Sequence, residues 1–247
     1  MVENMDNTSK IKEEKQRIRK MIWDLMEKYD IARFPRPVHG RIPNFVGAEL
    51  AAERIISLNI WVNANVVKAN PDSPQKPLRY RALCDGKILV MASPKLREGF
   101  LLLDPSKISS SKYAYASTIR GAFIYGKKIS LKDIPNIDLV ITGSVAVDRK
   151  GGRIGKGGGY AELEYAILRE IGSITEQTPV ITTVHDIQIV DHVPLEPHDL
   201  TVDYIGTPKR LYEITPRLPK PKGIYWELLG DKFKLKVIQE LRQFLRK

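Results

Sequence analysis

The chain contains 247 residues, of which 40 are basic and 29 acidic, so its formal charge at pH 7 is +11. Apolar residues make up 43% and are spread along the chain, which argues against intrinsic disorder, and no apolar run approaches the roughly 20 residues that span a bilayer. Cys84 is the only cysteine, which excludes an intramolecular disulfide and a cysteine-based zinc site. Together with a polar N-terminus that lacks an apolar secretory core, these features predict a soluble cytoplasmic protein with no membrane partner.

Charge is distributed unevenly along the chain. Residues 133–206 carry a net charge of −7, whereas the flanking stretches 68–132 and 207–247 carry +9 and +7. An acidic stretch between two basic ones favours a folded enzyme with a metal or a local acid–base site, because a nucleic-acid coat protein is typically basic throughout.

Hydrophobic periodicity and turn residues define the expected elements. In chain order these are a helix over 9–29, a helix over 47–58, a strand over 60–69, a hairpin over 79–92 with its turn at Asp85-Gly86, a strand over 137–148, a glycine-rich loop over 151–159, a helix over 160–171, strands over 179–186, 187–193 and 201–206, and a basic helix over 231–246. Strands that alternate with helices predict an α/β layered fold. We expect residues 1–247 to form a single domain on which the first and last helices pack.

The first expected helix carries two cations on one face. Ile18, Ile22 and Leu25 belong to its apolar stripe, and Lys15 precedes Arg19 by four residues. Side chains four residues apart project from the same side of a helix, so the two cations can act together. An ion pair with a neighbouring carboxylate is the alternative role for each of them.

The segment from Asp148 to Tyr160 (DRKGGRIGKGGGY) is the most informative stretch of the sequence. Glycine lets the backbone approach an anion closely, and the start of the following helix adds partial positive charge. The segment therefore predicts a phosphate-binding loop, with a flexible hairpin of solvated charges as the alternative. It is not a Walker A loop, because Lys156 is followed by Gly157, and it is not a dinucleotide fingerprint, because Tyr160 occupies the last position.

The loop resembles the ATP loop of the 5-formyltetrahydrofolate cyclo-ligases, also called methenyltetrahydrofolate synthetases. Other segments resemble the same family: Lys15-x-x-Ile18-Arg19, Asp186-x-Gln188 followed by Pro194, and His198-Asp199-x-x-Val202-Asp203. The fuller match is to the branch of methenyltetrahydrofolate synthetase domain-containing proteins, through residues 42–48, 67–72, 94–96 and 155–165. The resemblance covers about residues 10–240, and it is specific in combination.

This resemblance implies a fold and a reaction. The fold is a three-layer α/β/α domain with a mostly parallel central sheet. The reaction is the ATP- and Mg²⁺-dependent closure of 5-formyltetrahydrofolate to the 5,10-methenyl form, in which the formyl oxygen is phosphorylated, a folate nitrogen attacks and phosphate leaves. Such chemistry depends mainly on positioning and on charge neutralisation.

The resemblance also implies a role for each candidate site residue. By role these are Lys15, Arg19, Gly155, Gly157, Gly158 and Gly159 for the nucleotide, Arg153, Lys156 and Tyr160 for catalysis, Glu162 and Asp199 for Mg²⁺, and Phe45 and Glu49 for the folate or pterin. Core packing is the favoured alternative for Phe45. A partner for the helix dipole is the alternative for Glu162.

The histidines and the cysteine suggest less. A metal site of His185, His192 and His198 is not favoured, because strand geometry does not ensure that they converge. We expect Cys84 to be a small buried residue within a strand.

The sequence departs from the main branch of the family next to the loop. Ala161 and Glu162 stand where that branch has a second tyrosine and an aspartate, and the acidic folate-facing segment has only Glu49 as a near counterpart. ATP binding is therefore better supported than the identity of the acceptor. Two alternatives stay open: an ATP-dependent enzyme with the same fold and a different acceptor, and a nucleic-acid-binding module that uses the basic stretches 68–132 and 207–247.

Overall fold

The computed structural model describes the backbone of residues 2–246 and the side chains of residues 8–246. Its largest sheet has eight strands in the order β13-β12-β10-β7-β3-β4-β5-β6. In chain order these strands are β3 (Val66–Ala69), β4 (Ile88–Ala92), β5 (Phe100–Leu103), β6 (Lys127–Ile129), β7 (Leu139–Thr142), β10 (Val180–Thr183), β12 (Tyr204–Gly206) and β13 (Leu211–Glu213). The five central strands from β12 to β4 pair in parallel, and the strands at both edges are antiparallel.

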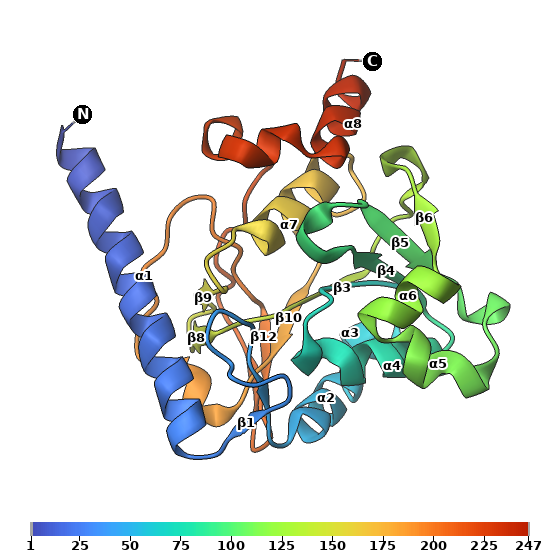
Figure 1. The fold of residues 1–247 in the computed structure, drawn as a ribbon, viewed down its shortest axis with the longest axis horizontal. Helices are drawn as coiled ribbons and strands as arrows, with labels where there is room; N and C mark the ends of the chain where they lie inside the picture. Colours follow the sequence, from blue (N-terminus) through green and yellow to red (C-terminus); the bar gives the residue numbers. More distant parts are fainter. Residues whose placement is uncertain (1, 247) are drawn as a thin grey trace.

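The central strands are buried on both faces, and their side chains alternate between two cores. Leu139 and Ile141 of β7 pack in one cluster with residues of α2 (Ala48–Ile56) and α4 (Lys76–Cys84). Val140, between them, packs in the other cluster with residues of α7 (Tyr160–Glu170) and α8 (Lys236–Phe244). This alternation is the two-residue period of a strand covered on both sides. The expectation of a three-layer α/β/α fold with a mostly parallel sheet is confirmed (Figure 1).

A smaller layer flanks the main sheet. The strands β11 (Ile189–Val190), β8 (Ala146–Asp148) and β9 (Arg153–Ile154) form a three-stranded sheet, and β1 (Ala32–Arg33) pairs with β2 (Asn44–Phe45). The long helix α1 (Val2–Lys28) lies along the β8 and β9 side of the molecule (Figure 1). Its residues Ile18, Ile22 and Met26 pack in a third core cluster with Ile154 of β9.

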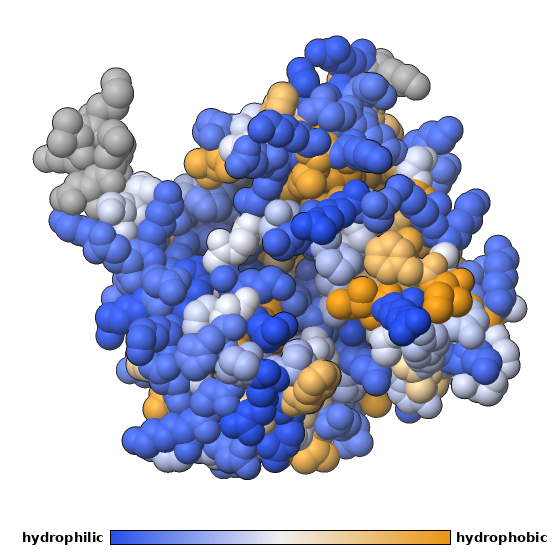
Figure 2. Space-filling view, in the orientation of Figure 1, coloured by the Kyte–Doolittle hydropathy of each residue, from blue (hydrophilic) through white to orange (hydrophobic). Residues whose placement is uncertain are grey.

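Three short helices complete the set of α-helices in the described chain. They are α3 (Asn59–Val62), α5 (Tyr113–Ala116) and α6 (Ile119–Tyr125). Figure 2 shows that apolar side chains gather over the α6 region, whereas the surface over α1 is mostly hydrophilic. The exposed apolar residues on α6 are Ile119, Phe123 and Ile124.

The expected hairpin over 79–92 is wrong. Residues 76–84 form helix α4, and the Asp85-Gly86 turn leads from this helix into β4. Leu78, Ala82 and Leu83 are all fully buried, and this spacing places them on one face of a helix, whereas the adjacent Ala82 and Leu83 would point to opposite faces of a strand. Cys84 is correspondingly exposed at the end of the helix and is not the buried strand residue that was expected.

Other boundaries also differ from the expected ones. The strand expected over 60–69 begins only at Val66, because Asn59–Val62 forms a helical turn that buries Trp61. The strand expected over 137–148 is divided into β7 and β8. The strand expected over 187–193 contains only the two residues of β11, and the last helix begins at Lys236.

Candidate functional site

The glycine loop lines a cavity at the carboxyl ends of the central strands. Gly155, Lys156, Gly158 and Gly159 contribute to its wall. Asn70 follows β3, Pro94 and Lys95 follow β4, and Gly143 follows β7, and all of these residues line the same cavity of about 500 Å³. Open α/β sheets bind ligands at this edge, where the carboxyl ends of parallel strands meet. We call this hollow the loop cavity.

Two glycines give the loop its path into α7. Gly157 and Gly159 have φ values of +96° and +63°, in the left-handed region that side chains disfavour. Gly159 is the residue that precedes the first turn of α7, an 11-residue helix with no side-chain cap at this end. The start of α7 therefore leaves backbone N–H groups at the loop cavity for an anion.

Arg153 is the buried centre of this site. Its Nε and one terminal nitrogen donate to the carbonyl oxygen of Gly143 at 3.0 and 2.8 Å, and its other terminal nitrogen donates to Glu162 Oε1 at 2.6 Å. Burial alone would raise the pKa of Glu162, but the charge of Arg153 and the hydrogen bonds to the carboxylate hold that pKa below its usual value. Arg153 and Glu162 thus form a charged pair whose geometry is fixed on the β9 and α7 sides of the cavity.

Lys15 reaches the site from the N-terminal helix. Its ammonium is nearly buried and donates to Glu196 Oε2 at 2.9 Å and to Asp199 Oδ2 at 2.5 Å. The same Asp199 oxygen accepts a hydrogen bond from the backbone N–H of Glu196 at 2.6 Å. The ion-pair alternative that the sequence left open for Lys15 is what the structure contains.

Arg19 joins the helix to the loop. Its Nε donates to the carbonyl oxygen of Gly155 at 2.8 Å. Burial lowers the pKa of Arg19, while the charges of Glu162 and Asp199 raise it. Arg19 therefore lies in the field of both expected metal ligands, so the helix, the loop and the 196–199 segment meet at one site.

Lys156 and Tyr160 lie on the more open side of the loop. The Lys156 ammonium donates to Asp72 Oδ1 at 3.0 Å and is about two-fifths exposed. Lys232, from the segment before α8, has its ammonium 5.4 Å from the ring centroid of Tyr160. Lys156 and Tyr160 line the loop cavity, so both are placed where a ligand would be in contact with them.

Phe45 and Glu49 are placed differently from each other. Phe45 is 2% exposed and packs in the core cluster beneath α1, with its ring edge toward His185. Glu49 lines a hollow of about 770 Å³ beside the loop cavity, which we call the Glu49 hollow. The two hollows share Pro71, Ser73 and Ile119, so they adjoin. Phe45 thus has the core role that was favoured as its alternative, whereas Glu49 faces open space.

The carboxylates fit a divalent cation only in part. Among the described residues, one group of three histidine or acidic side chains has its ligand atoms within 4.8 Å of one another, and its members are Glu196, His198 and Asp199. Carboxylate oxygens suit Mg²⁺, but the Lys15 ammonium is already bonded to both carboxylates of this group and offsets one of their two negative charges. Glu162 is outside the group and is paired with Arg153. The histidine trio does not converge in the described chain, since His198 groups with carboxylates instead.

Sequence reasoning missed a buried polar network in the loop cavity. Glu164 Oε2 accepts hydrogen bonds from Lys68 Nζ and Asn70 Nδ2, both at 2.6 Å. Burial raises the pKa of Glu164, although Lys68 opposes the shift. A lysine within the otherwise apolar strand VVKA was the available signal, because a buried lysine requires a partner.

The family model described as the 5-formyltetrahydrofolate cyclo-ligase family matches residues 11–208. The chain belongs to this family. The match includes Lys15, the glycine loop and Asp199.

Several members of the family resemble this cyclo-ligase-family chain. A methenyltetrahydrofolate synthase domain-containing protein of Bos taurus is 45% identical over 92% of the chain and 62% of its own length. The Homo sapiens protein of the same name is 42% identical over 92% of the chain and 61% of its own length. The chain therefore spans about three fifths of the length of these curated relatives.

More distant members support the fold. The 5-formyltetrahydrofolate cyclo-ligase of Mycolicibacterium smegmatis is 34% identical over 31% of the chain and 37% of its own length. The solved structure of Aquifex aeolicus 5,10-methenyltetrahydrofolate synthetase is 17% identical, with a TM-score of 0.51, over 83% of this chain and 94% of that one. That likeness shows a shared fold. None of the described helices has the length and apolar character needed to cross a membrane.

Proposed function

We propose that the chain catalyses the ATP- and Mg²⁺-dependent cyclisation of 5-formyltetrahydrofolate, or of a related formyl-pterin, to the 5,10-methenyl form. The observation that carries this proposal is the meeting of Arg19 and Arg153 at the glycine loop beside Glu162, with Lys15 bonded to Asp199, whose charge also acts on Arg19. Arg19 bonds to the loop carbonyl of Gly155, and Arg153 bonds to Glu162. Membership of the cyclo-ligase family supports the reaction class.

The chain's own residues would act mainly by positioning. Backbone N–H groups at the start of α7, together with Arg19 and Lys156, would hold the phosphates of the nucleotide. Arg153 is fixed by three hydrogen bonds, so it can stabilise negative charge without reorganising. When bound, ATP supplies the phosphoryl group that activates the formyl oxygen, and Mg²⁺ supplies positive charge beside it.

Mg²⁺ would be held by Asp199 and Glu162, or by Asp199 with Glu196. Lys15 is bonded to both Asp199 and Glu196 in the free protein, so its ammonium would have to turn toward the nucleotide phosphates when the cation binds. A lysine chain is flexible enough for this exchange. Lys15 would thus hold the carboxylate cluster together until a nucleotide–cation complex arrives.

The adjoining hollows suit a reaction with two substrates. The nucleotide would occupy the loop cavity, and the acceptor would extend into the hollow lined by Glu49. Each hollow is within the 300–1,000 Å³ that ligand pockets usually have. Pro71, Ser73 and Ile119 lie at the boundary between them, where the two reacting groups would meet.

A different acceptor with the same ATP chemistry is the second candidate. It is favoured by Ala161 beside the loop, which leaves the cavity without the tyrosine of the main branch, and by the burial of Phe45. The glycine loop and its cations would keep their roles. Only the partner in the Glu49 hollow would change.

The nucleic-acid alternative receives less support. Lys68, Arg79 and Lys87, which contribute to the basic stretch 68–132, are each less than a tenth exposed. Arg79 donates to the carbonyls of Ser117, Asn70 and Asp72, and Lys87 donates to that of Ala64. Part of this positive charge therefore stabilises the interior and does not face a partner.

The proposal is tested by the appearance of methenyl absorbance when the protein is mixed with 5-formyltetrahydrofolate, ATP and Mg²⁺. We expect product to form only with all three present, and with one ADP released per product. Measurable ATP binding without any product would remove the folate assignment and leave the second candidate. ATP turnover screened against other formyl and carboxyl compounds would then identify the acceptor.

A further inference from the structure

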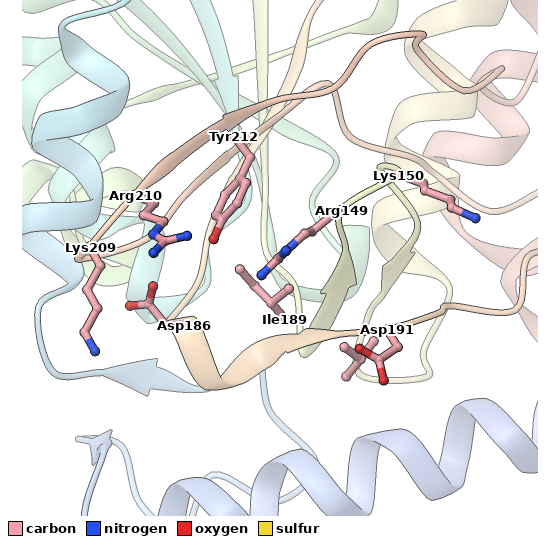
Figure 3. Close-up of a pocket in the computed structure, with 9 residues that line it drawn as sticks. Arg149, Lys150, Asp186, Ile189, Asp191, Lys209, Arg210 and Tyr212 are labelled. Atoms are coloured by element: carbon pink, nitrogen blue, oxygen red, sulfur yellow. The ribbon is translucent and has the colours of Figure 1, made fainter.

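A second cavity of about 470 Å³ lies away from the loop cavity and shares no lining residue with it. Its walls come from the turn between β8 and β9, from residues 186–191 around β11, and from the β12–β13 hairpin (Figure 3). Four cations line it: Arg149, Lys150, Lys209 and Arg210. Arg149 and Lys150 are the cations of the glycine segment that the proposed function does not use.

Two of these cations point at the same space. Figure 3 shows the guanidinium groups of Arg149 and Arg210 directed into the hollow with the ring of Tyr212, while Lys150 points away. Within the described part of the chain, no carboxylate forms an ion pair with any of the four cations. Their positive charge is therefore available to a ligand.

A buried carboxylate fixes the backbone beneath Arg149. Asp148 is 2% exposed, and its Oδ1 accepts hydrogen bonds from the N–H groups of Lys150 and Gly152, both at 2.9 Å. Its Oδ2 accepts from the N–H of Val193, also at 2.9 Å, which ties the turn to the segment after β11. One buried side chain thus holds two walls of the cavity together.

The hairpin that carries Arg210 is fixed in the same way. Thr207 Oγ1 accepts hydrogen bonds from the N–H groups of Lys209 and Arg210 at 3.2 and 2.8 Å. Arg54 of α2 donates twice to the carbonyl of Pro208, at 3.2 and 3.0 Å. Both arginines therefore extend from backbone that is already ordered, which reduces the entropy lost when they bind an anion.

The remaining side chains indicate the kind of anion. Arginine pairs favour phosphate, because the planar guanidinium donates two parallel hydrogen bonds to its oxygens. Tyr212 is half-buried, with its ring centroid 5.7 Å from the Arg149 guanidinium. Asp186 Oδ1 accepts from Thr207 Oγ1, but its Oδ2 is buried without a partner, so it can accept a hydrogen bond from a ligand hydroxyl.

We propose that this second cavity binds a phosphate ester of a small hydroxylated molecule, with Arg149 and Arg210 on the phosphate and Asp186 on a hydroxyl group. A small ligand fits better than a nucleic-acid strand, because Asp186 and Asp191 also line the cavity and would repel a continuous phosphate backbone. The site is independent of the cyclo-ligase reaction proposed for the loop cavity.

The test is a titration of the whole chain with ribose 5-phosphate, monitored by calorimetry and by the chemical shifts of the backbone amides in NMR. We expect chemical-shift changes at Gly151 and Arg210 and none at Gly157 and Gly159. The variant R149A/R210A is expected to bind at least tenfold more weakly, since each arginine contributes a charge-assisted hydrogen bond. K150A removes one positive charge from the same turn and is expected to change the affinity less than threefold.

Any of three other results overturns the proposal. Unchanged affinity in R149A/R210A, shift changes confined to the glycine loop, or no binding of ribose 5-phosphate would each do so. Binding of a single-stranded oligonucleotide at least tenfold tighter than ribose 5-phosphate, and lost in R149A/R210A, would replace the small ligand by nucleic acid. Because the arginines are exposed and unpaired, we expect an unchanged melting temperature in the variant, so loss of binding would not reflect unfolding.

Discussion

The two cavities use positive charge in opposite ways. At the glycine-loop site, Lys15 and Arg153 are buried, and each is already bonded to at least one carboxylate. In the second cavity, Arg149 and Arg210 are exposed and no described carboxylate pairs with them. The number of cations around a cavity therefore does not determine the net positive charge that a ligand meets there, because carboxylates already paired with the cations offset part of that charge.

Both kinds of cation come from one short segment. Arg149 lies in the turn after β8 and faces the second cavity, whereas Arg153 in β9 points toward Gly143 and Glu162. Removing a paired, buried cation leaves its carboxylate without compensation, while removing an unpaired, exposed one leaves nothing behind. Among paired cations, the loss of folding stability should therefore fall as the pair becomes more exposed.

The largest loss of stability is expected for Arg153→Ala. The substitution leaves Glu162 and the Gly143 carbonyl without their donor in a buried position. Breaking a buried pair in this way costs about 3–5 kcal/mol, which urea unfolding would measure directly. The double variant R153A/E162A should recover part of the loss, because it also removes the orphaned carboxylate. A loss below about 1 kcal/mol in R153A would contradict the account.

A smaller loss is expected for Lys15→Met. The ammonium holds Glu196 and Asp199 together, but it makes two hydrogen bonds where Arg153 makes three, and Asp199 keeps the hydrogen bond from the backbone N–H of Glu196. We expect about 2–3 kcal/mol, at or below the low end of the range for buried pairs. The unpaired carboxylates should also bind Mn²⁺ more strongly, seen as a larger rise in melting temperature with Mn²⁺ than in the unmodified protein. An equal response of both proteins to Mn²⁺ would argue against the ammonium–cation exchange.

Lys156→Ala separates stability from function. The Lys156–Asp72 pair is partly exposed, and such pairs contribute less than about 1 kcal/mol. Unfolding should therefore change little, whereas product formation should fall at least tenfold, because the side chain lines the loop cavity. Activity equal to that of the unmodified protein would remove Lys156 from the proposed catalytic set.

The smallest effect is expected for Arg17→Ala, the matched control on α1. Arg17 lies between Lys15 and Arg19 in sequence, but it is exposed, and its one ion pair with a described residue is with Glu14 one turn away. Removing it should leave both the unfolding curve and the rate of product formation unchanged. A clear change in either would show that α1 variants act through the helix as a whole.

The parts of the site that the sequence predicted are local. The spacing of Lys15 and Arg19 places both on one helix face, and the glycines of 155–159 disfavour a helix or a strand while allowing the positive φ values of a loop. The contacts that could not be predicted join distant segments, such as Lys15 with Asp199 or Lys68 with Glu164. Their pairing depends on how the layers stack, which no local pattern encodes.

The errors in the elements have the same origin. Residues 79–84 are predicted as a strand, yet Leu78, Ala82 and Leu83 pack on the core as one face of a helix. Phe45 was assigned to the folate although core packing was its favoured alternative, and α1 covers it. In both places tertiary packing overrides what the local sequence pattern predicts.

The most direct test of the central claim is the ATP dependence of methenyl product formation by the unmodified protein, Arg19→Ala and Arg17→Ala. Arg19 contacts the glycine loop through Gly155, so we predict that R19A raises the KM for ATP at least tenfold, while R17A matches the unmodified protein. If R19A and R17A showed the same KM, or if product formed without ATP, the loop cavity would not be the nucleotide site.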